Sequence, residues 1–146
     1  MAHFENAKKW LDRAKSDYAD ALVLDKHTWP KSTETICYLC QQATEKALKT
    51  ILVYNGDEVP KIHNIRDLMN LCVKYEPTVK VETRISMKLT DFAIASRYPD
   101  NLNEWTEEDT KLGLKYSNHT IDIVSAYLEK AEKETEDQEQ TSEALE

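Results

Sequence analysis

The chain has 146 residues, with 19 Lys and Arg against 27 Asp and Glu, and a formal net charge of -8. This length fits one compact domain, and no apolar run approaches the roughly 20 residues of a spanning helix or the apolar stretch of a signal peptide. We therefore expect a cytoplasmic protein without membrane contact. Two glycines and four prolines are too few for the tight turns of all-β or doubly wound folds. The composition predicts an all-α fold.

The first two predicted helices cover residues 4–25 and 33–54. In both, apolar residues recur three and four positions apart, as on one face of a helix. Pro30 interrupts the pattern between them, and Ser32 or Thr33 is the expected cap of the second helix. The apolar arc of this second helix is the broader one, which predicts that it is the most buried helix of a bundle.

A third and a fourth helix are predicted over residues 65–75 and 78–96. Asn64, followed three positions later by Asp67, is a capping pattern for the third. Pro77 is expected in the first turn of the fourth. The inward stripe of the fourth helix consists of Val81, Ile85, Leu89 and Phe92.

A fifth helix is predicted to begin after Thr106, which forms a capping pattern with Asp109, and to end near residue 131. Residues 1–131 are therefore expected to form an up-and-down bundle of four to five helices. The apolar stripe is lost beyond this point, and residues 132–146 are expected to be an acidic, disordered tail.

The three cysteines are candidate ligands of a metal ion. Cys37 and Cys40 form a C-x-x-C pair, and Cys72 and His63 are conceivable further zinc ligands. No second C-x-x-C is present, and the two cysteines lie on apolar turns of the most buried helix, where cysteine packs as a small hydrophobic residue. We therefore expect free thiols in the core, no metal and no cofactor.

Several cations are candidate phosphate ligands. Lys80, Arg84 and Lys88 recur every four residues, which favours either a row of phosphate contacts or, as we expect, a solvated face with Glu76 and Asp91 as partners. On the second helix Glu45 and Lys49 have the favourable i,i+4 order. Lys46 is expected to pack its stem and carry its ammonium to the rim of the bundle.

The most informative short segment begins at Arg97. Asp100 can hold this arginine in place while the guanidinium faces a phosphate, or the two can form a purely structural pair. Both interpretations stay open. His119, close to Tyr116 on the last helix, would face Arg97 across the bundle, although a structural histidine is the default expectation.

Four segments in a fixed order carry a family resemblance. They are an opening helix with Ala7, Trp10, Leu11, Ala14 and Asp17, CYLCQQATEKALKTILVYNG over residues 37–56, HNIRDLMNLC over residues 63–72, and SRYPD over residues 96–100. This ordered set resembles the HEPN family, the higher eukaryotes and prokaryotes nucleotide-binding domains. The resemblance implies a helical bundle that forms a homodimer.

The resemblance also implies two classes of function. Many HEPN domains are metal-independent ribonucleases that use an Arg followed four to six residues later by a His, across a dimer cleft. Others lack this pair and act as the binding partner of a minimal nucleotidyltransferase, in toxin–antitoxin-like pairs. Arg97 matches the arginine, but residues 101–103 are Asn, Leu and Asn. Losing the His removes acid–base catalysis worth about 10² to 10⁴-fold.

We therefore expect a non-catalytic homodimer that binds a nucleotide or RNA phosphate and partners a nucleotidyltransferase. The expected phosphate-binding residues are Arg97, Lys46, His63, Tyr98 and Asp100. One alternative is a divergent ribonuclease in which Arg97 and His119 are catalytic. Another is a plain helical interaction domain.

The charge is unevenly distributed along the chain. Residues 129–146 hold eight acids and two bases, a balance of -6, whereas residues 1–128 hold 19 acids and 17 bases, a balance of -2. The acidic total argues against a strong, sequence-reading nucleic-acid binder. The nearly neutral body still permits a small phosphate-facing cleft.

Overall fold

The computed structural model describes residues 2–28, 31–95 and 105–146. The order of elements is α1 (Ala2–His27), α2 (Thr33–Tyr54), α3 (Ile65–Cys72), a 3-10 turn η1 (Pro77–Val79), α4 (Thr83–Ala95) and α5 (Glu107–Leu145). Across these described ranges no β-strand occurs, and no helix is both long and apolar enough to cross a membrane. The predicted all-α fold is confirmed.

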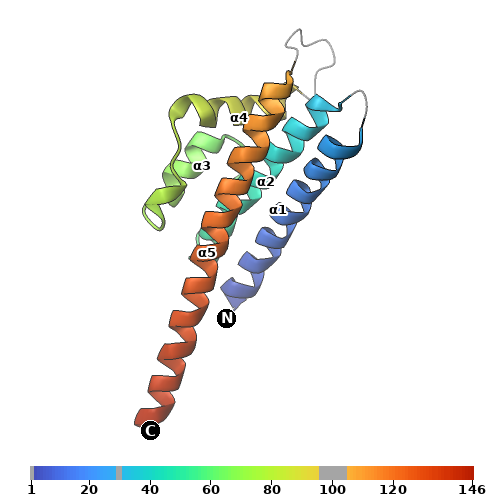
Figure 1. Cartoon of the computed structure of the whole chain (residues 1–146). Coiled ribbons are helices and arrows are strands. Elements are labelled where there is room, and N and C mark those ends of the chain that lie inside the picture. Colours follow the sequence, from blue (N-terminus) through green and yellow to red (C-terminus); the bar gives the residue numbers. More distant parts are fainter. Residues whose placement is uncertain (1, 29–30, 96–104) are drawn as a thin grey trace.

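Helix α2 is the centre of the bundle. It contacts α1, α3, α4 and α5, and Figure 1 shows α1 on one side of it and α3 with α4 on the other. Fourteen of its 22 residues are buried, so the prediction that it is the most buried helix is confirmed. Gly56, at φ 73°, follows its end in the left-handed conformation that glycine tolerates best. Ser32 occupies the N-cap position of α2, as predicted, but its side chain makes no cap hydrogen bond.

Helices α3 and α4 are shorter than predicted. The Asn64 side chain accepts a hydrogen bond from the Asp67 backbone N–H at 3.1 Å, which confirms the predicted cap of α3. This helix ends at Cys72 and not at residue 75. Pro77 opens η1 in place of the predicted fourth helix, and α4 begins only at Thr83. A proline fits the first turn of either kind of helix, so its presence does not distinguish them.

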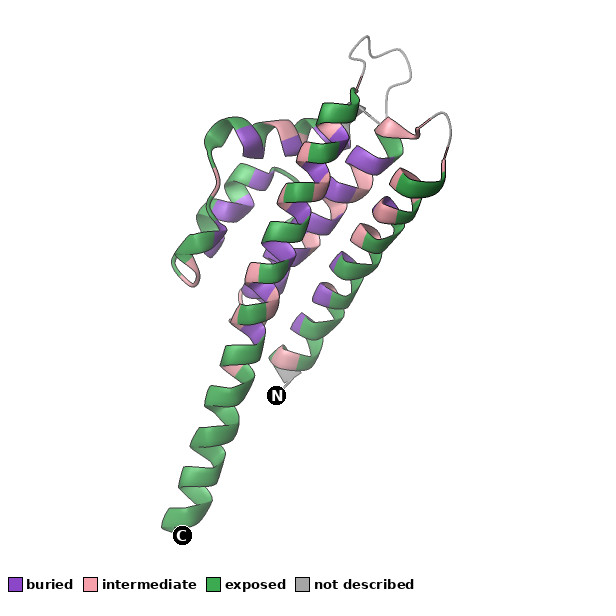
Figure 2. Ribbon diagram, viewed as in Figure 1, coloured by how far each residue is buried: buried purple, intermediate pink, exposed green. Residues whose placement is uncertain are grey.

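Helix α5 begins with the predicted capping box, in which Thr106 and Asp109 each accept a backbone hydrogen bond from the other. It does not end near residue 131 but continues to Leu145, so residues 132–145 are helical where we expected disorder. The extension is exposed throughout and projects beyond the bundle in Figure 2. Its Glu, Lys, Ala and Gln residues favour helix, and lengthening a nucleated helix is easier than starting one.

Candidate functional site

A buried ion pair lies on one face of α2. The Glu45 and Lys49 side chains are each only 6% exposed, and Lys49 Nζ lies 3.6 Å from Glu45 Oε2. The Gln41 amide nitrogen, also buried, is 3.5 Å from the other carboxylate oxygen of Glu45. The i,i+4 spacing predicts that Glu45 and Lys49 form an ion pair, and the structure shows that this pair is buried. Two charges in such a setting depend on each other, because either alone would be poorly solvated.

His63 extends this pair to the surface. Its Nδ1 lies 2.8 Å from Glu45 Oε1, and its side chain is 62% exposed. Gln41 donates a hydrogen bond to the backbone carbonyl of His63 at 3.4 Å, which holds the segment before α3 against α2. His63 is therefore oriented by a buried carboxylate and has an open outer side.

Lys46 points towards α1. Its Nζ lies 2.6 Å from Asp17 Oδ2, and the two side chains are 25% and 19% exposed. The ammonium thus reaches the rim of the bundle, where it joins α2 to α1. Lys46 and His63, both predicted phosphate ligands, are each held by a carboxylate, and the two carboxylates belong to different helices.

Next to Lys46 an open recess of about 260 Å³ lies between α1 and α2. Its other lining residues are Lys9, Trp10 and Arg13, all on α1. Trp10 is partly buried, and the buried Lys49 Nζ lies 5.9 Å from the centre of its ring. Sequence reasoning missed Lys9, Trp10 and Arg13 as functional candidates, although the i,i+4 spacing of two cations beside an aromatic residue was a readable signal.

The remaining predicted site residues divide into two groups. Arg97, Tyr98 and Asp100 lie outside the described residues, so their roles stay predictions. His119 is exposed on α5, with its ring centre 6.5 Å from that of Tyr116 in an edge-on arrangement. Its predicted position opposite Arg97 stays a prediction as well.

The predicted row of cations on the fourth helix does not form. Lys80 precedes α4, and only Arg84 and Lys88 lie on it. Lys88 pairs with Asp109 of α5 at 3.3 Å and lies 4.9 Å from the Trp105 ring centre. The partner of Lys88 is thus neither of the predicted acids, Glu76 and Asp91, and the lysine joins two helices instead.

The three cysteines pack in the core as predicted. Cys37, Cys40 and Cys72 are fully buried, and Cys72 Sγ donates a hydrogen bond to the Leu48 carbonyl at 3.2 Å. Burial raises the pKa of each thiol to about 12, against an ordinary value of 9.0. Within the described part of the chain, no three metal-ligating side chains gather into a site.

These thiols are expected to resist alkylation while the protein is folded. At pH 8 a thiol with a pKa near 12 has almost no thiolate, which is the reactive form. We expect iodoacetamide to leave the folded chain unmodified and to label all three cysteines in denaturant, as measured by mass spectrometry. Rapid labelling of Cys37 or Cys40 in the folded protein would contradict their burial.

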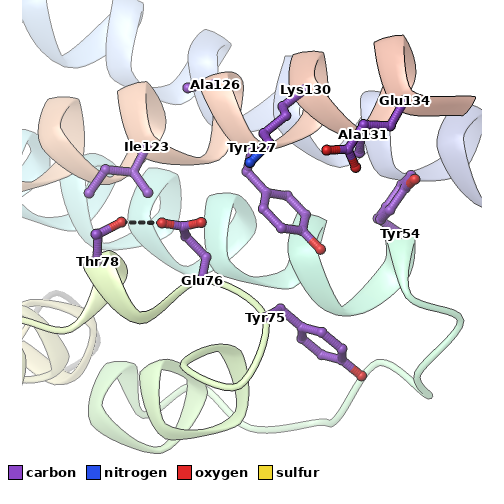
Figure 3. A pocket seen from close by; sticks show the side chains of 10 residues that line it. All are labelled: Tyr54, Tyr75, Glu76, Thr78, Ile123, Ala126, Tyr127, Lys130, Ala131 and Glu134. Atoms are coloured by element: carbon purple, nitrogen blue, oxygen red, sulfur yellow. Dashed lines mark hydrogen bonds between the residues drawn. The ribbon is translucent and has the colours of Figure 1, made fainter. Parts of the chain in front are cut away.

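A second hollow, of about 430 Å³, lies between the end of α2, the turn η1 and α5. Figure 3 shows Tyr54, Tyr75 and Tyr127 around it. The Tyr75 hydroxyl donates to Asp57 at 2.7 Å, and that hydrogen bond raises the pKa of Tyr75. The Tyr127 hydroxyl accepts from the Asn55 amide at 3.0 Å. Two of the three hydroxyls are thus used to hold the end of α2 in place.

Comparison with known proteins places the fold in a family. The sequence profile of the HEPN domain matches residues 7–130, nearly the whole bundle. The chain belongs to the HEPN family. Among solved structures, TT1696 from Thermus thermophilus superposes with a TM-score of 0.66 at 24% identity, over 83% of this chain and 97% of that one. ST0689, described as an archaeal HEPN homologue, gives 0.63 at 23% identity, over 84% and 97%.

These two likenesses concern the fold, because sequence identity in both is below 25%. No protein of curated function matches the chain. A functional proposal therefore rests on membership of the HEPN family and on the side chains described above.

Proposed function

We propose that this HEPN domain is a non-catalytic module that binds a nucleotide or RNA phosphate as a homodimer. The observation that carries the proposal is the sequence after Arg97, where Asn101, Leu102 and Asn103 replace the histidine that the ribonucleases of the family require. The arginine that would hold a phosphate is kept, and the acid–base group is missing at its required spacing. Binding without cleavage is what this combination favours.

The cationic recess between α1 and α2 supports the phosphate-binding part. Lys9 and Arg13 are exposed, and within the described ranges neither has a carboxylate within ion-pairing distance. The acidic residues that dominate the net charge lie mainly on the projecting end of α5. The body of the domain therefore offers positive charge locally despite the acidic total.

The partner that we propose is a minimal nucleotidyltransferase, in a toxin–antitoxin-like pair. This follows from the family class that lacks the ribonuclease pair. The test is to express the chain with its neighbouring reading frames and to purify it at moderate salt. We expect a small nucleotidyltransferase in a stable complex with a dimer of this chain. A monomer that purifies without such a partner and retains no nucleotide or RNA would contradict the proposal.

Deleting residues 132–146 is expected to strengthen polyanion binding at low salt. The segment carries seven acids and one base, and its exposed helix makes no contribution to the core. Removing it lowers the repulsion of a negatively charged ligand, an effect that salt screens. We expect a higher affinity for RNA in low salt and an unchanged melting temperature. Equal affinities at low salt would show that the segment only solvates the domain.

A further inference from the structure

The recess beside Trp10 combines an aromatic surface with free positive charge. The indole is covered from the interior, where the buried Lys49 ammonium lies 5.9 Å from its ring centre. Its remaining exposed part borders the open recess. A partly exposed tryptophan that packs against the core is a suitable stacking platform, because every nucleobase has a flat aromatic face.

The cations beside Trp10 favour binding of an anionic ligand that extends along α1. Lys9 and Arg13 are one helical turn apart, so their side chains neighbour each other on the surface. Lys46 is different, since Asp17 already holds its ammonium at 2.6 Å. Among the described residues neither Lys9 nor Arg13 forms an ion pair, and Lys46 forms the wall of the recess.

The opposite side of α1 provides a natural contrast. Lys8 and Lys15 have the same charges and belong to the same helix, but they line a hollow with Asp12, Glu129 and Glu132. Three carboxylates in the lining of the same hollow lower the local positive potential, and so weaken the attraction of these two lysines for phosphate. Among the described residues, the lining of the Trp10 recess holds no carboxylate, and Lys9 and Arg13 lie there beside a partly exposed aromatic ring.

We infer that the Trp10 recess binds one base of a single-stranded nucleic acid, with Lys9 and Arg13 on the phosphates that flank it. This inference rests on the proposed phosphate-binding function and names the ligand class and its contacts. The recess, at about 260 Å³, is smaller than the roughly 300 to 1,000 Å³ of sites that enclose a whole small molecule. A strand that lays one base into it and continues along the surface suits this size better than a free mononucleotide.

The test measures binding of a fluorescein-labelled oligoadenylate of roughly 12 nucleotides by anisotropy. Three variants of the full chain are compared with the wild type: Trp10→Ala, Lys9→Gln with Arg13→Gln, and Lys8→Gln with Lys15→Gln. The last two change the net charge equally on opposite sides of α1. Unlabelled oligoadenylate and AMP serve as competitors.

We expect Trp10→Ala to weaken binding about 5- to 150-fold, which is the usual range for one lost stacking contact. The Lys9/Arg13 variant is expected to weaken binding and to lower its salt dependence by about 1.4 in log–log slope, for two phosphate contacts on a single strand. The Lys8/Lys15 variant should bind as the wild type does, and AMP should compete far less well than the oligonucleotide.

Three results would overturn the inference: a folded Trp10→Ala variant with wild-type affinity, equal losses in the two double variants, or AMP competing as well as the oligonucleotide. If Trp10→Ala does not fold, the comparison of the Lys9/Arg13 variant with the Lys8/Lys15 variant decides, because Lys9 and Arg13 are exposed and their substitution leaves the core intact.

An Arg97→Ala variant separates the inference about the Trp10 recess from the proposed function. If Arg97→Ala abolishes RNA binding while Trp10→Ala and the Lys9/Arg13 variant bind as the wild type does, the Trp10 recess is not the binding site. The proposed function then still stands. Wild-type protein that binds neither ligand overturns both.

Discussion

Replacing Glu45 by Ala is expected to lower the free energy of unfolding by about 3 to 5 kcal/mol. The substitution leaves the buried Lys49, whose side chain is 6% exposed, without its carboxylate partner. It also removes the hydrogen-bond partner of His63. An unpaired charge in the interior is among the few causes of so large a loss from a single substitution. Denaturant unfolding followed by circular dichroism measures the effect.

Two controls separate the buried pair from helix propensity. Glu34→Ala makes the same change at an exposed position in the first turn of α2 and should cost less than about 1 kcal/mol. Replacing Glu45 and Lys49 together by Met removes both charges and should restore most of the lost stability. A Glu45→Ala variant as stable as the Glu34→Ala variant would show that Lys49 reaches water.

Phe92→Ala is expected to cost about 3 to 5 kcal/mol of stability. Phe92 is 1% exposed on α4, and its ring meets that of Trp105 edge-on with centres 5.0 Å apart. These two residues flank the chain segment that contains Arg97. Losing their contact should therefore weaken phosphate binding as well as stability, measured by thermal unfolding and by RNA titration at a temperature where the variant is folded.

The matched control for Phe92→Ala is Met87→Ala on the same helix. Met87 is 55% exposed and lies outside the core, so its truncation should change stability by no more than about 0.5 kcal/mol. Similar losses in the two variants would mean that the side of α4 bearing Phe92 does not anchor the bundle.

Local patterns predicted the features of this fold that depend on near neighbours in the chain. The bounds of α2, the Asn64 cap and the Thr106–Asp109 capping box each depend on residues within a few positions of one another. Helix ends without such a signal were predicted less well. Pro77 starts a 3-10 turn as readily as an α helix, and nothing in the tail of α5 stops a helix that is already formed.

The site depends on residues that meet only when the helices pack. Lys46 reaches Asp17 across 29 positions of the chain, and His63 reaches Glu45 across 18. Helical spacing showed that Glu45 and Lys49 share a face, but not that the face is buried. The Trp10 recess likewise appears only when α1 lies beside α2, which brings Lys46 and Trp10 into the lining of one recess.

Incubation of the purified protein with end-labelled single-stranded RNA, without metal, tests binding without cleavage most directly. We expect the RNA to be bound and to stay intact, and Arg97→Ala to lower its affinity at least about 10-fold, as for a lost charge-assisted contact to phosphate. Cleavage that leaves a 2′,3′-cyclic phosphate, and that both Arg97→Ala and His119→Ala abolish, would contradict this and establish a ribonuclease.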